Sequence, residues 1–558
     1  MRRAILLGTI PLIAAVAGLD PMPVHGDPAP NFVLIFVDNL GNGDLACFNS
    51  REHRTPHCTP HIDRLADEGT RFTSFYVASG VCTPSRAALM TGCYPRRVNM
   101  HESGSGGLVL TPLDTKGLNP AETTIAEILQ PAGYATAAFG KWHLGDQPQF
   151  LPTRQGFDAF FGIPYSDDMT RDKRPDRWPE LPLLRDETVI EAPVDRDYLV
   201  RRTTTETIAF IERNRDRPFF AYIPHTMPGS TKQPFASSAF RGHSANGAYG
   251  DAVEELDWST GEIVAALQRL GIDDRTLIVW ASDNGAVRRN PPQGSCAPYR
   301  GWGYDTSEGA MRVPCIMRWP GHVPAGRTCD ELCSTLDLLP TFAALAGASP
   351  PKQTIDGHNI APIVLGQADA TSPWDDDGFC YYYKGQLQAV RSGPWKLYLP
   401  LDKKLVSGAG KTITAPLALY DVRNDVSEEH ELAAEQPDVV SRLMRMANRS
   451  REELGDLDSQ GQNVPGRGQR PAGFVEHPIP LLPSSSDRAR TLDGDWLRPR
   501  VISSFDHAEL LTGAQRIVFQ YQGLDEHAAG RSRQIDRHAV GHHLGNPVPL
   551  RDSRALVD

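Results

Sequence analysis

The chain has little positive charge for its size. Its 558 residues carry 57 Lys and Arg against 68 Asp and Glu, a formal net charge of −11. A chain with this deficit does not present a general nucleic-acid or polyanion surface, so we expect no nucleic-acid partner. Any anionic substrate must therefore be attracted by positive charge gathered at one place.

Cysteine is scarce as well. Nine cysteines in a chain of this length do not make a disulfide scaffold, and none shows the C-x-x-C spacing of a metal site. Cys47–Cys58 and Cys329–Cys333 are candidate local disulfides, although sequence alone does not fix the connectivity. The odd count leaves one cysteine over.

Long hydrophobic runs are absent after the N-terminus. Residues 1–26 have a basic start, an apolar run and then small residues, which is typical of a signal peptide. An anchoring helix is the alternative, but the run is short and contains Pro11. We expect cleavage near Gly18 or Gly26, no membrane span afterwards, and export to a periplasmic, secreted or lysosome-like compartment.

Strand patterns alternate with helical patterns up to about residue 370. Four short apolar runs predict buried parallel strands, at 31–38, 134–139, 217–225 and 275–285. Helical patterns lie between them, at 60–68, 123–130, 200–212 and 248–270. This alternation predicts an α/β domain over 27–370 with a mostly parallel sheet sandwiched by helices.

After residue 370 the alternation of strand and helix patterns gives way to closely spaced strand patterns. The runs 379–385 and 388–398 predict two strands around a Ser-Gly-Pro turn, and 437–453 predicts a helix. We therefore expect a smaller α+β subdomain over 371–480. Residues 481–558 contain no Lys, no Cys and little apolar periodicity, which predicts a polar, partly disordered tail.

The run Cys82-Thr-Pro-Ser-Arg86 is the most informative local pattern. Pro84 suits the first turn of a helix and Thr83 is a candidate N-cap. Residue 82 is then expected at a helix N-terminus, which favours an anion, and Arg86 adds a permanent positive charge. Taken alone, the run also fits a buried or disulfide-bonded cysteine before an ordinary helix.

Polar side chains follow the four predicted strands where each strand ends. They are Asp38 and Asn39, Lys141 and His143, His225, and Asp283 and Asn284. Open α/β sheets bind ligands at that edge, and the oxygens of the two Asp-Asn pairs suit a hard cation, calcium before magnesium. Each pair alone is also an ordinary turn, and each histidine an ordinary loop or strand-end residue. Their coincidence with Cys82 favours a site.

C-x-P-S-R followed by Thr91-Gly92 resembles the signature of the type I sulfatases. Other runs look like this family, in family order from residue 31 to about 475: 31–45, 59–73, 82–95, 140–145, 218–225, 283–285, 308–314 and 419–422. The run 162–168 looks closest to the arylsulfatase A and N-acetylgalactosamine-6-sulfatase branch. The resemblance implies an alkaline-phosphatase-like α/β fold with a large mixed sheet and a smaller C-terminal antiparallel sheet plus helix.

The resemblance also implies an exported enzyme that hydrolyses aryl or carbohydrate sulfate esters. A maturation enzyme would oxidise Cys82 to formylglycine, whose hydrate would attack the sulfur. Arg86 and Lys141 would hold the hydrate and the sulfate oxygens, His143 would take a proton from the hydrate, and His225 would protonate the leaving group. One calcium ion would be bound by Asp38, Asn39, Asp283, Asn284 and the formylglycine at position 82.

Two positions depart from the family pattern. The family usually has an aspartate where Asn39 stands, so the site loses one negative charge and we expect weaker calcium binding. The family's second active-site lysine falls on Gly303, and no lysine lies nearby. Either His225 alone protonates the leaving group, or Arg300 or an adjacent residue compensates as a substrate-binding group. We expect a lysine introduced at Gly303 to alter turnover without changing metal content.

Two other functions stay open on sequence alone. One is a phosphodiester or phosphonate hydrolase of the same superfamily. The other is a sulfated-glycan-binding pseudoenzyme, which Asn39 and Gly303 suggest. Retention of Cys82, Lys141 and His225 argues against the pseudoenzyme.

Overall fold

The computed structural model describes residues 29–49, 55–290, 293–407, 410–457 and 459–464. The expected signal peptide and the expected tail lie outside these ranges. Within the ranges, helices that are both long and apolar enough to cross a membrane are absent.

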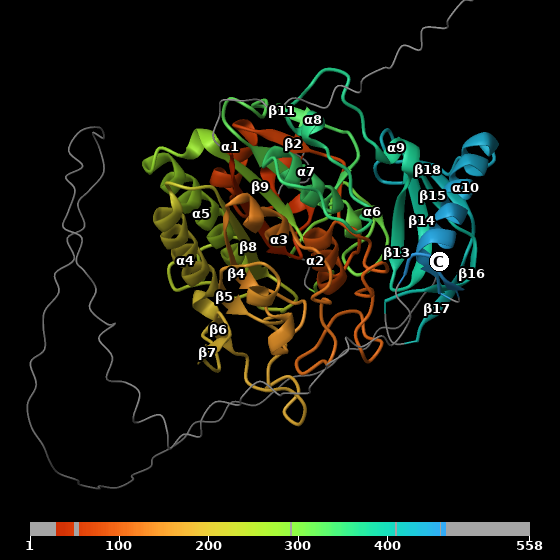
Figure 1. Cartoon of the computed structure of the whole chain (residues 1–558). Coiled ribbons are helices and arrows are strands. Elements are labelled where there is room, and N and C mark those ends of the chain that lie inside the picture. The colour runs from red at the N-terminus through yellow and green to blue at the C-terminus, as the bar shows by residue number, and fades with distance from the viewer. Residues whose placement is uncertain (1–28, 50–54, 291–292, 408–409, 458, 465–558) are drawn as a thin grey trace, which may run out of the picture. The chain divides into compact units, whose positions relative to one another are not determined.

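A ten-stranded mixed sheet forms the centre of the large α/β unit (Figure 1). Its strands, in spatial order, are β11 (Arg327–Cys329), β2 (Thr70–Phe72), β10 (Cys315–Arg318), β9 (Thr276–Ser282), β1 (Asn31–Asp38), β8 (Phe219–Pro228), β4 (Ala135–Lys141), β5 (Ala159–Ile163), β6 (Leu183–Arg185) and β7 (Thr188–Glu191). The strands β9, β1, β8, β4 and β5 run parallel. The four predicted strands are therefore confirmed as neighbours in one parallel block.

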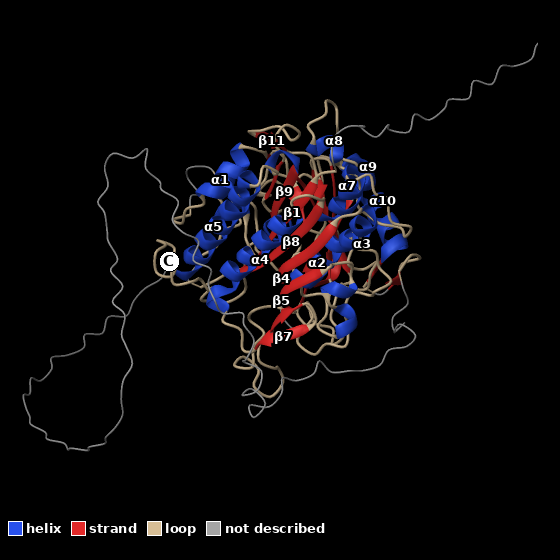
Figure 2. Ribbon diagram, turned by 60° about the vertical axis from the view of Figure 1, so that its left-hand side comes forward, coloured by secondary structure: helices blue, strands red, loops and turns tan. Residues whose placement is uncertain are grey.

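Alternate side chains of β1 enter two different cores. Phe32, Leu34 and Phe36 pack with α2 (Cys82–Thr91), α3 (Ile125–Leu129) and α7 (Leu338–Leu345). Val33, Ile35 and Val37 pack with α1 (Pro60–Asp67), α4 (Leu199–Asn214) and α5 (Gly247–Arg269). Figure 2 shows the sheet between these helices. A strand buried on both faces has an unbroken apolar sequence, which is why the run 31–38 predicts it well.

A second, antiparallel sheet lies beside the first, with α10 (Pro437–Leu454) packed on it (Figure 1). Its order is β13 (Phe379–Tyr383), β14 (Gln386–Ser392), β15 (Trp395–Tyr398) and β18 (Ala418–Asp421). The prediction of two strands in 379–398 was wrong, because there are three. Lys384 takes a left-handed φ of 53° and turns the chain with Gly385, so that Tyr383 pairs with Gln386. Two-residue hairpins need such residues.

The remaining elements are short. They are β3 (Phe75–Tyr76) paired with β12 (Cys333–Ser334), β16 (Leu401–Leu405) paired with β17 (Thr412–Ala415), β19 (Gly455–Asp456) paired with β20 (Ser459–Gln460), and the helices α6 (Glu308–Met311), α8 (Ala361–Val364) and α9 (Trp374–Asp377).

Buried charges join the second sheet to the first residue of α6 and to the residues just before it. Lys396 of β15 donates from Nζ to Glu308 Oε1 at 2.9 Å and to the Thr306 carbonyl at 3.2 Å. The Tyr381 hydroxyl of β13 donates to the same Glu308 oxygen at 3.0 Å. Lys396 and Glu308 are fully buried. The second sheet therefore holds the chain at Thr306 and Glu308, a few residues after Gly303.

All nine cysteines are free thiols, so neither candidate disulfide forms. Cys329 ends β11 of the large sheet, whereas Cys333 begins β12 of a separate two-stranded sheet. The three residues between them lead from one sheet to the other, and both side chains are buried as free thiols.

Candidate active site

Cys82 is the first residue of α2, at the helix mouth that the sequence predicts. Thr83 is not the N-cap; Val81 holds that position in an extended conformation. The Thr83 hydroxyl instead donates to the His143 carbonyl at 3.1 Å and accepts the Leu110 N–H at 3.2 Å. Thr83 thereby connects the start of α2 to the loop after β4. The adjacent Cys82 is buried, with only 4% of the residue exposed.

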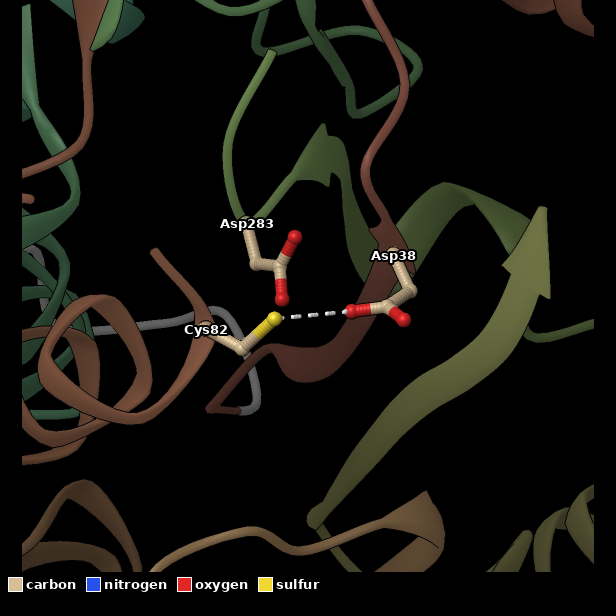
Figure 3. A group of neighbouring side chains, drawn as sticks. All are labelled: Asp38, Cys82 and Asp283. Atoms are coloured by element: carbon tan, nitrogen blue, oxygen red, sulfur yellow. Dashed lines mark hydrogen bonds between the residues drawn. The ribbon is translucent and has the colours of Figure 1, made fainter. Parts of the chain in front are cut away.

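Asp38 and Asp283 face the Cys82 thiol from the ends of β1 and β9 (Figure 3). One ligand atom from each of these three residues lies within 4.8 Å of the others. Asp38 Oδ1 accepts from Lys141 Nζ at 2.8 Å, from Arg86 Nη2 at 3.2 Å and from Cys82 Sγ at 3.4 Å. Asp283 Oδ2 accepts from Arg86 Nη2 at 2.7 Å and Nε at 3.1 Å. Two buried cations and two buried carboxyls thus surround the thiol.

The surroundings of Cys82 keep its thiol protonated. Burial raises the pKa of this thiol well above its usual value, and the charges of Asp283 and Asp38 raise it further. For Asp38, burial acts in the same direction, but Lys141 and Arg86 outweigh it and hold the pKa of that carboxyl below its usual range. A protonated thiol is a poor nucleophile. The site therefore does not suit a cysteine that attacks as a thiolate.

Asn39 and Asn284 meet beside the two carboxyls. Asn39 has a left-handed φ of 63°, its N–H donates to Asp283 Oδ1 at 3.0 Å, and its Oδ1 accepts from Asn284 Nδ2 at 2.5 Å. Asn284 Oδ1 and Asp38 Oδ2 are buried without a hydrogen-bond partner. Buried polar atoms are normally paired, and an all-oxygen set of carboxylates and amides fits a hard cation. The residues present therefore fit a calcium ion.

The surroundings of His143 leave one ring nitrogen as an unprotonated acceptor. It has a left-handed φ of 60°, and its Nε2 lies 3.0 Å from the Leu110 carbonyl. A carbonyl only accepts, so Nε2 carries the proton and Nδ1, which is buried without a partner, carries a lone pair. Burial lowers the pKa of His143 well below its usual value, and Lys141 adds to this. The ring is neutral, with a free acceptor nitrogen.

A chain of hydroxyls sets the tautomer of His225. Thr204 Oγ1 donates its only proton to the Val200 carbonyl at 2.7 Å. In the 2.6 Å hydrogen bond between Thr204 and Ser259, the Ser259 hydroxyl is therefore the donor. Ser259 then accepts from His225 Nε2 at 3.1 Å. His225 Nδ1, buried and unpartnered, therefore carries no proton while the ring is neutral. Burial lowers the pKa of His225 to about 3.

Arg300 lies against the second sheet. Its guanidinium donates from Nε to Glu428 Oε2 at 3.1 Å, and its side chain is 46% exposed. It also lies over the ring of Tyr420, 5.1 Å from the centroid. Arg300, proposed from the sequence as a replacement for the missing lysine, is therefore already bound to Glu428 and packed on Tyr420.

Gly303 lies beside the predicted metal ligand Asn284. A Cβ added to Gly303 would lie 2.5 Å from the Gly285 carbonyl oxygen and 3.3 Å from Asn284 Nδ2. The next residue, Tyr304, has a left-handed φ of 79°, and its hydroxyl lies 2.6 Å from Ser230 Oγ. Ser230 Oγ in turn accepts from Asn39 Nδ2 at 3.1 Å. The phenol of Tyr304 is therefore linked to the predicted metal ligand Asn39 through Ser230.

The sequence prediction missed four residues of this site: Ser166, Asp167, Ser230 and Tyr304. Lys141 Nζ lies 3.3 Å from Ser166 Oγ. Ser166 and Asp167 belong to the run 162–168, whose likeness to one branch of sulfatases was the available signal. Ser230 and Tyr304 lie in irregular segments whose paths no sequence pattern predicts.

Comparisons with known proteins agree on one family. A sulfatase family model matches residues 30–348, and a model described as N-sulphoglucosamine sulphohydrolase, C-terminal, matches residues 302–453. Arylsulfatase A from Homo sapiens is 36% identical over 79% of this chain and 92% of its own length. N-acetylgalactosamine-6-sulfatase from Mus musculus is 37% identical over 70% of this chain and 75% of its own length. The crystal structure of Ps i-CgsB in complex with k-i-k-neocarrahexaose is 29% identical, with a TM-score of 0.65 over 78% of this chain and 95% of that one.

Proposed function

The chain belongs to the sulfatase family and is a sulfuric ester hydrolase, and we propose that its nucleophile is a formylglycine made from Cys82, with calcium bound by Asp38, Asn39, Asp283 and Asn284. One observation carries this proposal. The side chain of residue 82 lies at a helix N-terminus among Asp38, Arg86 and Lys141, yet its thiol is held protonated. Such a position suits an anionic reaction centre but not a thiolate.

Formylglycine is an aldehyde, and its hydrate would supply a hydroxyl nucleophile where the thiol now lies. Arg86, Lys141 and the free N–H groups of α2 supply positive charge for the sulfate oxygens. His143 Nδ1, a bare acceptor, is suited to take a proton from a hydroxyl at position 82. The calcium ion would polarise the sulfate, held by the two Asp-Asn pairs.

We propose that protonation of the leaving group depends on His225. In its neutral form this ring offers an acceptor rather than a donor at Nδ1, so it must gain a proton before it can donate one. The negative charge of a bound sulfate ester favours the imidazolium. An aryl leaving group depends less on such a proton than an alkyl one does, because an aryloxide is a weaker base than an alkoxide. We propose aryl or carbohydrate sulfates as substrates and phosphodiesters as the class to be excluded.

The proposal includes export and a maturation step. Residues 1–26 have the pattern of a signal peptide, and a formylglycine-generating enzyme would convert Cys82 before the chain is folded. This enzyme is the one protein partner that the proposed chemistry requires.

The test combines peptide mass spectrometry with a substrate panel. Protein made in a host with the maturation machinery should carry an aldehyde at residue 82 and release inorganic sulfate from an aryl sulfate or a sulfated sugar. Cys82→Ala, which cannot be converted, should lose this activity. An unmodified thiol in fully active protein would refute the proposed nucleophile, and faster turnover of phosphodiesters would refute the proposed substrate class.

A further inference from the structure

Asp167 is a buried carboxyl for which neither oxygen has a hydrogen-bond partner. It follows β5 and is 0% exposed. Its backbone carbonyl is held by Arg196 Nη1 at 3.2 Å, so the position is fixed while the side chain is left unpaired. An unpaired buried carboxyl is costly, and burial, with the charges of Asp168 and Asp38, raises its pKa to about 7.

The carboxyl of Asp167 borders the same space at Gly229 as an oxygen of Asp38. A Cβ added to Gly229 would lie 3.2 Å from Asp167 Oδ1 and 3.6 Å from Asp38 Oδ2. The absence of a side chain at Gly229 therefore leaves these two oxygens bordering the same small space. Both oxygens are buried and unpartnered. The preceding residue, Ser166, contacts Lys141 Nζ, and the charges of Asp38 and Lys141 both act on the Asp167 carboxyl.

The charge of the cluster is balanced before a metal is added. Asp38 and Asp283 are matched by Arg86 and Lys141, all four buried. A divalent cation added to this set is left uncompensated, because Asn39 is neutral where the family pattern has an aspartate. At short range in a poorly screened interior, one further carboxylate changes cation affinity strongly.

We propose that Asp167 supplies the third negative charge of the calcium site, in place of the carboxylate that the family pattern has at position 39. The inference rests on the proposed calcium site. It concerns only which carboxyls balance the charge of the ion. Asn39 keeps its two roles, as an amide oxygen near the ion and as the donor to Ser230.

The neighbouring residue provides a matched control. Asp168 also carries a carboxyl, but its side chain is 16% exposed and forms an ion pair with Lys173. Asp168→Asn removes the same charge one residue away and leaves the unpaired buried carboxyl in place.

The experiment is a calorimetric titration of calcium into the metal-free full-length protein at pH 8. Asp167→Asn should raise the calcium Kd about tenfold or more, and Asp168→Asn should change it by less than about threefold. The double variant Asn39→Asp with Asp167→Asn should recover most of the lost affinity. Equal Kd values for the Asp167 and Asp168 variants, or no recovery in the double variant, would overturn the inference.

A single variant keeps the test valid if Asp167→Asn does not fold. With Asp167 in place, Asn39→Asp should tighten calcium binding by less than about threefold, because the third charge is already present. A tenfold or greater gain would overturn the inference. Failure of the wild-type protein to bind calcium would instead refute the proposed metal site, so the two failures are distinguishable.

Discussion

A lysine at position 303 is expected to damage the site rather than restore it. The Cβ that any side chain adds there lies 2.5 Å from the Gly285 carbonyl oxygen, whereas ordinary contact begins at 3.4 Å. The clash is with backbone, so the segments at 285 and 303 must separate by roughly an ångström, at a cost of about 1–3 kcal/mol. The same Cβ lies 3.3 Å from Asn284 Nδ2, so the shift reaches a proposed metal ligand. This reverses the expectation from sequence that metal content would not change.

The measurement is thermal unfolding and calcium titration of Gly303→Lys beside Gly303→Ala. Because both variants add the same Cβ, both should lower Tm by a few degrees and weaken calcium binding. The alanine variant separates the effect of the Cβ from that of the ammonium group. Wild-type Tm and calcium affinity in Gly303→Lys, together with faster turnover, would show that the steric reasoning is wrong and that the position accepts its family lysine.

Three further predictions concern the leaving group, acid stability and the second sheet. Tyr304→Phe removes one hydroxyl beside the site and should lower kcat/KM more for alkyl than for aryl sulfates; equal losses would indicate a structural role. Burial lowers the pKa of His225 from 6.5 to about 3, so its neutral ring contributes stability above pH 6.5 that is lost as pH falls. His225→Gln should therefore lessen the loss of unfolding free energy between pH 7 and pH 4, by roughly 3 kcal/mol in urea titrations, and an unchanged loss would contradict this. Lys396→Met leaves Glu308 without its nearest cation and should cost about 3–5 kcal/mol, whereas the exposed Lys403→Met should cost under about 0.5 kcal/mol; similar losses would contradict the assigned network.

The strand ends were predictable from sequence because parallel topology brings them together. Asp38, Lys141 and Asp283 each stand at the end of an apolar run that has to be a central strand, and the four consecutive parallel strands β9, β1, β8 and β4 present their ends at one edge. Arg86 was predictable because it lies one turn into the helix that Cys82 begins.

Other parts of the site depend on contacts that no local pattern encodes. The tautomer of His225 is set by Ser259 and Thr204, which come from two helices distant in sequence. The position of Tyr304 follows from one left-handed backbone angle in an irregular segment. Arg300 is held by Glu428, 128 residues away, so its engagement with the second sheet could not be anticipated.

The burial of Cys82 bears on whether its proposed conversion occurs before or after folding. Only 4% of this residue is exposed once α2 has docked against β1 and β9, so a modifying enzyme cannot reach the thiol in the finished fold. If Cys82 is converted as proposed, conversion has to precede or compete with acquisition of the tertiary structure. On this proposal, a chain that folds first would keep an unconverted thiol and be inactive, so the specific activity of a preparation should follow the fraction of chains converted before folding.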